Sequence, residues 1–448
     1  MSVPAPARLA PVYFTAADDP AFAAQCDALR ELLAGDAELL APVALGDPVP
    51  AEADGALFAQ MVGDGFRRAA EIRATGLPVL VLTSEFGTMA MWDWELIAYL
   101  REEGIDAIAP YSVQDARIAC RALAARRALR EGSFVVYQDA PGVGGHQPEI
   151  FKRFYWWEEE CLQRMRERFG VRVIVRSFRE LGARARALPD AVAAEERERI
   201  GATVPTGEDL RERAMLAALK LYRAIADDLA GEPGVLAAGL NCLNESGFSD
   251  TTPCLAWDLL YRRQQLVWGC EADTVSMLTK FILLRTLQRP TMMTNLYPFL
   301  MGQAALKHER IPSFPDVPEP ENHILAAHCG YLGLLPQPMA VEWTLRGKVL
   351  AIVGDDSAVH DALLPTGDLT LAKLDPSFGR LVVIEGELEG YAGYPGSDCV
   401  NGGVIRVPDG HALMTGLPSH HSLIFTGHAR AGLELIGRVF GLEVERLG

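Results

Sequence analysis

The chain has 448 residues, of which 49% are hydrophobic and 23% are charged, and its formal net charge is −17. This length exceeds one typical core, so two or three domains are expected, and the hydrophobic content excludes a disordered chain. The negative charge argues against a nucleic-acid partner or an anionic membrane, because phosphate groups bind to concentrated basic surfaces.

The eight cysteines form no CxxC pair, and several stand in apolar runs, which is typical of reduced cytosolic thiols. The N-terminus has no basic segment followed by an apolar one, so we expect no signal peptide. The longest apolar stretches are shorter than the roughly 20 residues that span a bilayer. These features predict a cytoplasmic protein without a membrane partner.

Strands and helices alternate through residues 1–186. A short apolar run at Leu9–Phe14 precedes helix-like patterns near Ala21–Leu33 and Leu57–Ala74. Further along, apolar runs bounded by turn residues predict strands at Leu77–Thr83, Ala107–Pro110, Ser133–Tyr137 and Val171–Val175. The intervening patterns predict a helix that ends at Gly104 and helices at Val113–Glu131 and Pro148–Phe169. This alternation is typical of a mostly parallel sheet and predicts a Rossmann-like domain.

A polar segment at Ala187–Val204 marks the crossing into a second α/β domain, predicted over residues 187–340. A long helix is expected at Gly207–Ala230. Two apolar runs at Gly234–Leu243 and Gln265–Cys270 predict buried strands, joined by a helix at Pro253–Arg263. A helix at Thr274–Leu287 and a strand at Thr291–Asn295 follow.

The character of the chain changes at about Val341. Short β-rich runs with Gly and Asp turns predict an antiparallel sheet or small barrel over residues 341–448, with a last helix at Ala429–Phe440. The predicted fold is therefore α/β, with two Rossmann-like parallel-sheet domains followed by a C-terminal antiparallel β-barrel-like domain.

Acidic side chains follow both apolar runs of the second domain: Glu245 after the first, and Glu271 and Asp273 after the second. Ligands of open α/β sheets bind beyond the carboxyl ends of the strands, so these acids predict a site. Each also has a structural alternative, because Glu245 can be a solvated loop acid or a helix cap, Asp273 an N-cap, and Glu271 a helix-dipole partner. A further apolar run ends on His328, and two acids with an imidazole would suit a divalent metal.

Three other features are candidates for binding. Paired histidines such as His420 and His421 are commonly metal or proton-transfer groups, and the sequence leaves open which of the two turns inward. His146 follows a Gly-rich turn, either as part of a tight turn or as an anion or sugar contact. That turn lacks the spacing of a dinucleotide fingerprint or a P-loop, so NAD and ATP are not predicted. Trp92 belongs to the core or an interface, or offers a platform for a sugar ring.

Six short motifs occur in order through the second half of the chain: NCLNE, TPC, GCEAD, MTNLYPF, AHCG and PSHH. This succession resembles the L-fucose isomerase and L-arabinose isomerase superfamily, and LPVLVLTSEF and DAPGVGG fit its N-terminal Rossmann-like domain more loosely. The resemblance implies that two acids and a histidine hold Mn²⁺ or another divalent ion such as Co²⁺ or Mg²⁺. By their place in the motifs, Glu245 and Asp273 correspond to the acids, and His421 or His420 to the histidine.

The resemblance also implies an activity and an assembly. The expected reaction is aldose–ketose isomerisation of a sugar through a cis-enediol, with Glu245 and Asp273 shuttling the proton. Epimerisation, aldol-type cleavage and sugar binding without catalysis are the alternatives. A homo-oligomer, trimer or hexamer, is implied, with the pocket at a subunit interface. The expected substrate-binding residues are His328, Asn295, Glu271, His146 and Trp92.

Overall fold

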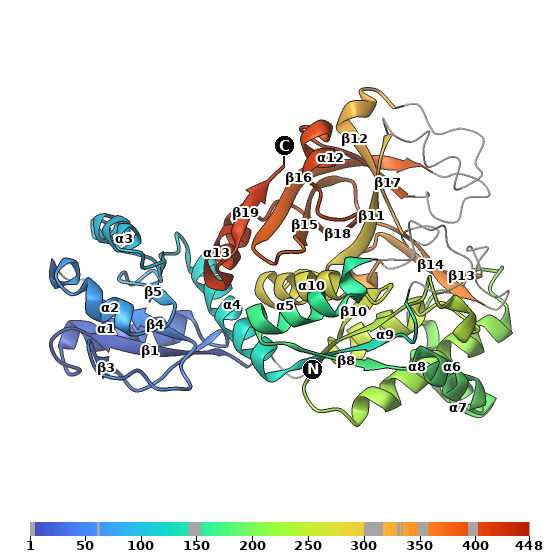
Figure 1. Ribbon diagram of the computed structural model, residues 1–448, viewed down its shortest axis with the longest axis horizontal. Coiled ribbons are helices and arrows are strands. Elements are labelled where there is room, and N and C mark those ends of the chain that lie inside the picture. The colour runs from blue at the N-terminus through green and yellow to red at the C-terminus, as the bar shows by residue number, and fades with distance from the viewer. Residues whose placement is uncertain are drawn as a thin grey trace.

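The computed structural model describes residues 5–60, 63–141, 154–299, 317–328, 332, 335–347, 357–392 and 402–447. These residues form two parallel sheets, a closed antiparallel barrel and a two-stranded ribbon. Figure 1 shows the first sheet at one end of the molecule, joined through α4 to the second sheet and the barrel. None of the helices in these ranges is both long enough and apolar enough to cross a lipid bilayer.

The first sheet has the order β2-β1-β4-β5-β6, with β3 also paired to β1, and all of its pairs are parallel. Its strands are β1 (Ala7–Tyr13), β2 (Ala37–Leu39), β3 (Val43–Ala44), β4 (Gly55–Phe58), β5 (Val79–Val81) and β6 (Ala107–Ile108). Its helices are α1 (Pro20–Leu32), η1 (Gly63–Phe66), α2 (Ala69–Ala74) and α3 (Asp93–Glu102). The helix predicted over Leu57–Ala74 is wrong at its start, which belongs to β4. A short run that is buried throughout, as β4 is, does not distinguish strand from helix by periodicity.

The second sheet has the order β10-β9-β7-β8 and is also parallel. Its strands are β7 (Ser133–Tyr137), β8 (Arg172–Arg176), β9 (Val235–Leu240) and β10 (Val267–Cys270). The helices around it are α4 (Val113–Glu131), η3 (Tyr155–Trp157), α5 (Glu159–Phe169), α6 (Phe178–Ala187), α7 (Asp190–Ile200), η4 (Gly201–Thr203), α8 (Glu212–Ala230), η5 (Ser246–Phe248), α9 (Cys254–Gln264) and α10 (Thr274–Leu287). The helix predicted from Pro148 starts later, at Glu159, and residues 148–153 lie outside the described ranges.

Six strands close into the barrel in the order β15-β18-β11-β12-β17-β16, and β16 pairs back with β15. Every pairing around this ring is antiparallel. The barrel strands are β11 (Met292–Pro298), β12 (His323–Ala327), β15 (Gly367–Leu374), β16 (Arg380–Ala392), β17 (Gly402–Arg406) and β18 (His421–Thr426). The other elements of this half are η7 (Pro320–Asn322), η8 (Gln337–Met339), the antiparallel ribbon of β13 (Glu342–Gly347) and β14 (Ala358–Leu363), α12 (Gly410–Gly416), α13 (Arg430–Phe440), and β19 (Glu443–Arg446), which is parallel to β16.

The fold class is as predicted, but the sheets divide the chain at other points than 186 and 340. Strands β7 and β8 lie in the range assigned to the first domain, yet β7 pairs with β9, and β8 pairs with β7 at the edge of the same second sheet. Strands β11 and β12 lie in the range assigned to the second domain, yet they belong to the barrel. Hydrophobic periodicity identifies a buried strand but carries no information about its pairing partner.

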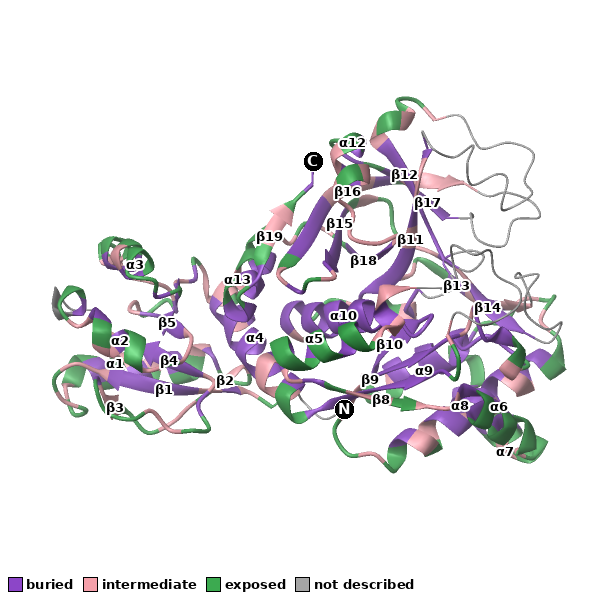
Figure 2. Cartoon of the chain, viewed as in Figure 1, coloured by how far each residue is buried: buried purple, intermediate pink, exposed green. Residues whose placement is uncertain are grey.

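Helix α10 packs between the second sheet and the barrel, in contact with β9, β10, β15 and β18. All of its residues except Arg285 are buried, as its colour in Figure 2 shows. A helix that is apolar on every side belongs in a core. Its first turn is therefore held rigidly at the point where the second sheet faces the barrel.

Lys280 is the buried charged-type residue of α10. Its side chain is 1% exposed, and its Nζ lies 3.0 Å from the centre of the Trp268 ring without a hydrogen bond to any described residue. Burial lowers the pKa of Lys280 well below its usual value. The folded protein therefore holds this amine neutral at a pH where the unfolded chain protonates it.

We expect Lys280→Met to raise the free energy of unfolding at neutral pH by about 1–3 kcal/mol, the usual cost of an unsatisfied buried polar group. The wild type should also gain stability as pH rises toward about 10.4, since the unfolded lysine binds the extra proton. The variant should lack this increase of stability with pH. Urea unfolding at several pH values measures both effects, with Arg166→Met, which replaces an exposed cation of α5, as the control. A variant less stable than the wild type would contradict the prediction.

Candidate metal centre

The two predicted strands that are followed by acidic residues are present. Strands β9 and β10 are parallel neighbours, with Leu240 opposite Cys270, and α9 connects them as expected. Glu245 and Glu271 therefore follow two adjacent strands at the carboxyl edge of the second sheet. The barrel meets this edge through His421, the first residue of β18.

Glu271, His420 and His421 form a cluster of three possible metal ligands, one atom of each lying within 4.8 Å of the others. His421 Nε2 is 3.5 Å from Glu271 Oε1, which is longer than a normal hydrogen bond. Within the described ranges, neither His421 Nε2 nor Glu271 Oε2 has a hydrogen-bond partner. Buried polar atoms normally have partners, and two imidazoles with a carboxylate are a common donor set for a divalent metal. The residues therefore fit such an ion.

Asp273 is not one of the three possible ligands but contacts one of them, His421. Its Oδ2 lies 2.8 Å from His421 Nδ1, 2.9 Å from Lys373 Nζ and 2.7 Å from the hydroxyl of Ser276. Its Oδ1 accepts the backbone N–H of Ser276 at 2.8 Å, so Asp273 is the N-cap of α10. Burial acts to raise the pKa of Asp273, but Lys373 and His421 outweigh it and lower the pKa below its ordinary value. The carboxylate is ionised, and His421 Nδ1 donates to it.

These contacts reverse the roles predicted for two of the acids. Asp273 was expected to be a ligand, but four donors already engage its two oxygens, and its hydrogen bond leaves the lone pair of His421 on Nε2, facing Glu271. Glu271 was expected to contact substrate, yet it supplies the carboxylate of the cluster. The geometry favours Glu271 as the ligand and Asp273 as the residue that orients His421.

The histidines differ in the direction of their pKa shifts. Burial lowers the pKa of His420 and of His328 to about 3, so both imidazoles are neutral at physiological pH. Burial acts in the same direction on His421, but the charges of Glu271 and Asp273 outweigh it and raise its pKa. Neutral imidazole is the form that binds a metal ion. Both histidines of the PSHH motif belong to the cluster by the positions of their ring nitrogens.

His328 adds a third imidazole beside the cluster. Its ring centroid lies 5.9 Å from that of His421, and its Nδ1 is 3.2 Å from Asn295 Oδ1. Its Nε2 has no hydrogen-bond partner within the described part of the chain. Asn295, predicted to lie near the sugar, faces His421 across the β11–β18 pair and contacts His328. His328 reaches the site from the end of β12 in the barrel, and not from the parallel sheet.

The backbone at Glu271 is held in an uncommon conformation. Glu271 and Ala272 have φ angles of +54° and +51°, in the left-handed region that non-glycine residues rarely adopt. The indole N–H groups of Trp156 and Trp157 donate to the carbonyl of Glu271 at 3.3 and 2.8 Å, and the Trp156 ring packs 5.1 Å from His421. Such strain persists where the surroundings fix it, often at functional sites.

Three supporting residues were missed from the sequence. Trp156 and Trp157 fall within the predicted helix Pro148–Phe169, but nothing in the sequence pattern shows where an indole N–H points. Lys373 was detectable in principle, since a lysine inside the apolar strand TLAKL needs a buried anion as partner.

The remaining predicted residues are not part of this group of three donors. Glu245 accepts the backbone N–H groups of Asp139, at 3.1 and 3.0 Å, and of Ala140, at 2.7 Å, and burial raises its pKa. Trp92 is 68% exposed in the first domain, at the start of α3 and far from β10 in Figure 1. His146 falls outside the described residues.

Comparison with known proteins assigns no function to this chain. No protein-family model matches it, and no curated protein is detectably similar to it in sequence.

Proposed function

We propose that the protein is a divalent-metal-dependent aldose–ketose isomerase that acts on a sugar through a cis-enediol. The observation that carries the proposal is the cluster of buried Glu271 and His421 with half-buried His420, in which Asp273 orients His421. The α/β-plus-barrel architecture and the order of the motifs also support it. Mn²⁺ or Co²⁺ suits this donor set better than Mg²⁺, because two imidazoles favour a transition metal.

The residues in and around the cluster have different proposed roles. Glu271, His420 and His421 would hold the ion, and the chemistry supplied by a bound divalent ion is polarisation of the substrate oxygens, which acidifies the C2 proton. Glu245 is the proposed base, and its raised pKa suits a group that removes the proton from C2 and returns it to C1. The Nε2 of His328 is available to bind a sugar hydroxyl. Asp273 positions His421 and moves no proton.

A product analysis tests the reaction. The purified protein is incubated with Mn²⁺ and a panel of pentoses, hexoses and uronates in D₂O. We expect one aldose to give its ketose with deuterium at C1. Epimers would indicate the rival epimerase, two smaller products an aldol-type lyase, and binding without turnover a sugar-binding protein. Glu245→Gln should lower kcat by about 10²–10⁴-fold with its metal content unchanged. Undiminished turnover would exclude Glu245 as the base.

We also propose a cytoplasmic homo-oligomer, trimer or hexamer, in which the first domain completes the pocket of a neighbour. The support is an exposed apolar patch in that domain, formed by Phe86, Met91, Trp92 and Trp94, because soluble monomers rarely expose such clusters. Trp92→Ser with Trp94→Ser should reduce the particle mass measured by light scattering. A monomeric wild type at working concentration would overturn this assembly, and recovery of the protein from a membrane or periplasmic fraction would overturn the location.

A further inference from the structure

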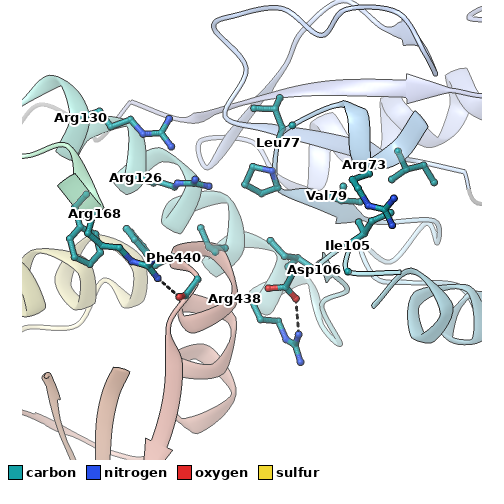
Figure 3. Close-up of a pocket in the computed structure, with 18 residues that line it drawn as sticks. Arg73, Leu77, Val79, Ile105, Asp106, Arg126, Arg130, Arg168, Arg438 and Phe440 are labelled. Atoms are coloured by element: carbon teal, nitrogen blue, oxygen red, sulfur yellow. Dashed lines mark hydrogen bonds and ion pairs between the residues drawn. The ribbon is translucent and has the colours of Figure 1, made fainter. Parts of the chain in front are cut away.

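A pocket of about 440 Å³ lies at the amino-terminal edge of the first sheet. Leu77 and Ile105, just before β5 and β6, form one wall, and the C-terminal parts of α4, α5 and α13 form the other (Figure 3). Ligands of α/β sheets usually bind at the opposite, carboxyl edge. The pocket shares no residue with the Glu271 cluster, so it needs its own explanation.

The charge of this pocket is opposite to that of the chain. Five arginines and one acid line it: Arg73, Arg126, Arg130, Arg168, Arg438 and Asp106. Arg438 pairs with Asp106 at 2.9 Å, Arg168 donates to the carbonyl of Gly441, and Arg73 donates to Glu103. Protein groups thus engage three of the five guanidinium groups.

The other two, Arg126 and Arg130, stand one turn apart on α4 and extend side by side into the pocket in Figure 3. Neither has a hydrogen bond or ion pair with any residue in the described ranges. Burial, and then the charges of Arg130 and Arg168, lower the pKa of Arg126. Like charges one turn apart destabilise a helix, so the fold alone gives no reason for this pair.

Helix ends explain part of the arrangement. Arg73, Arg130, Arg168 and Arg438 lie in the last turns of α2, α4, α5 and α13, where a cation offsets about half a unit of negative charge per helix. Arg126 lies more than one turn before the end of α4, so this effect does not reach it. The five guanidinium groups also carry more positive charge than Asp106 and these helix ends together offset.

We propose that this pocket binds a small molecule that carries a phosphate group. Guanidinium groups bind phosphate oxygens through paired, charge-assisted hydrogen bonds, and Arg126 and Arg130 present two such groups together. Leu77, Ile105 and Phe440 offer apolar contact to the rest of the ligand, and the volume lies within the usual range of about 300–1,000 Å³. A ligand that touches both walls joins the first sheet to α13 and stabilises the folded protein.

Calorimetric titration with inorganic pyrophosphate tests the proposal on the full chain at constant ionic strength. We expect saturable binding with one site per chain, and a rise in melting temperature with pyrophosphate but not with chloride. Arg126→Ala should weaken binding by about tenfold or more, since a hydrogen bond to a charged group is lost. Arg430→Ala, which removes an exposed arginine of α13 outside the pocket, is the matched control and should bind like the wild type.

Without pyrophosphate, Arg126→Ala should be at least as stable as the wild type, because it removes a repelled charge. A purely structural role for Arg126 would lower its melting temperature instead. Arg130→Ala and Arg126→Lys serve as further variants if Arg126→Ala does not fold, and both should weaken binding. No saturable binding up to about 1 mM, a very weak affinity, would overturn the proposal, as would equal binding by all the pocket variants.

Discussion

Replacing Glu271 with glutamine is expected to abolish tight divalent-metal binding. Glutamine keeps the shape of the side chain but removes the only carboxylate in the described cluster of three donors. Even residues that merely orient a metal ligand change affinity by about 10–100-fold, so loss of the ligand itself should exceed about 100-fold. Titration of the metal-free protein with Mn²⁺ and Co²⁺, together with the visible spectrum of the Co²⁺ form, measures the effect.

The controls distinguish this arrangement from the one that the motifs first suggested. Glu245→Gln should retain its metal, because that carboxylate binds the amides of Asp139 and Ala140. Asp273→Asn should lose only about 10–100-fold in affinity, because His421 keeps its place but not its best partner. If Glu271→Gln binds metal normally and Asp273→Asn does not, the roles assigned from the structure are reversed.

The strand ends at Glu245 and Glu271 were predictable because the evidence for them is local. Apolar runs bounded by turn residues identify β9 and β10, and parallel pairing places their carboxyl ends at one edge. The evidence that decides whether Glu271 or Asp273 is the metal ligand is not local in the sequence. It depends on the left-handed backbone at Glu271 and Ala272, which the indole N–H groups of Trp156 and Trp157 hold from over 100 positions earlier in the chain.

The assignment of β11 and β12 failed for a related reason. Their apolar pattern is that of any buried strand, and only the pairing with β17 and β18 places them in the barrel. That pairing brings His328 and Asn295 to the cluster from the barrel side. The sequence thus identified these residues and the strands that carry them, but not the sheet to which those strands belong.

Asp273→Ala is expected to cause the largest loss of stability among the single substitutions considered. Asp273 is fully buried, and it is the acid that pairs with Lys373, which is itself only 2% exposed. Removing one partner of a buried ion pair leaves an uncompensated charge and costs about 3–5 kcal/mol. The substitution also removes the N-cap of α10, which contributes about 1 kcal/mol. Urea unfolding in the presence of a chelator measures the loss without a contribution from bound metal.

A double variant distinguishes the stability lost through the unpaired buried charge from the stability lost with the N-cap. Asp273→Ala combined with Lys373→Met removes both members of the pair, so most of the loss due to the buried charge should be recovered, while the loss of the cap remains. Ser276→Ala, which removes one hydroxyl donor to Asp273 but keeps the ion pair, should cost only about 1 kcal/mol. A loss below about 1 kcal/mol for Asp273→Ala alone would mean that Lys373 is neutral in the folded protein. In that case the hydrogen bond from His421 would be the main interaction of Asp273, and its role would be confined to the metal centre.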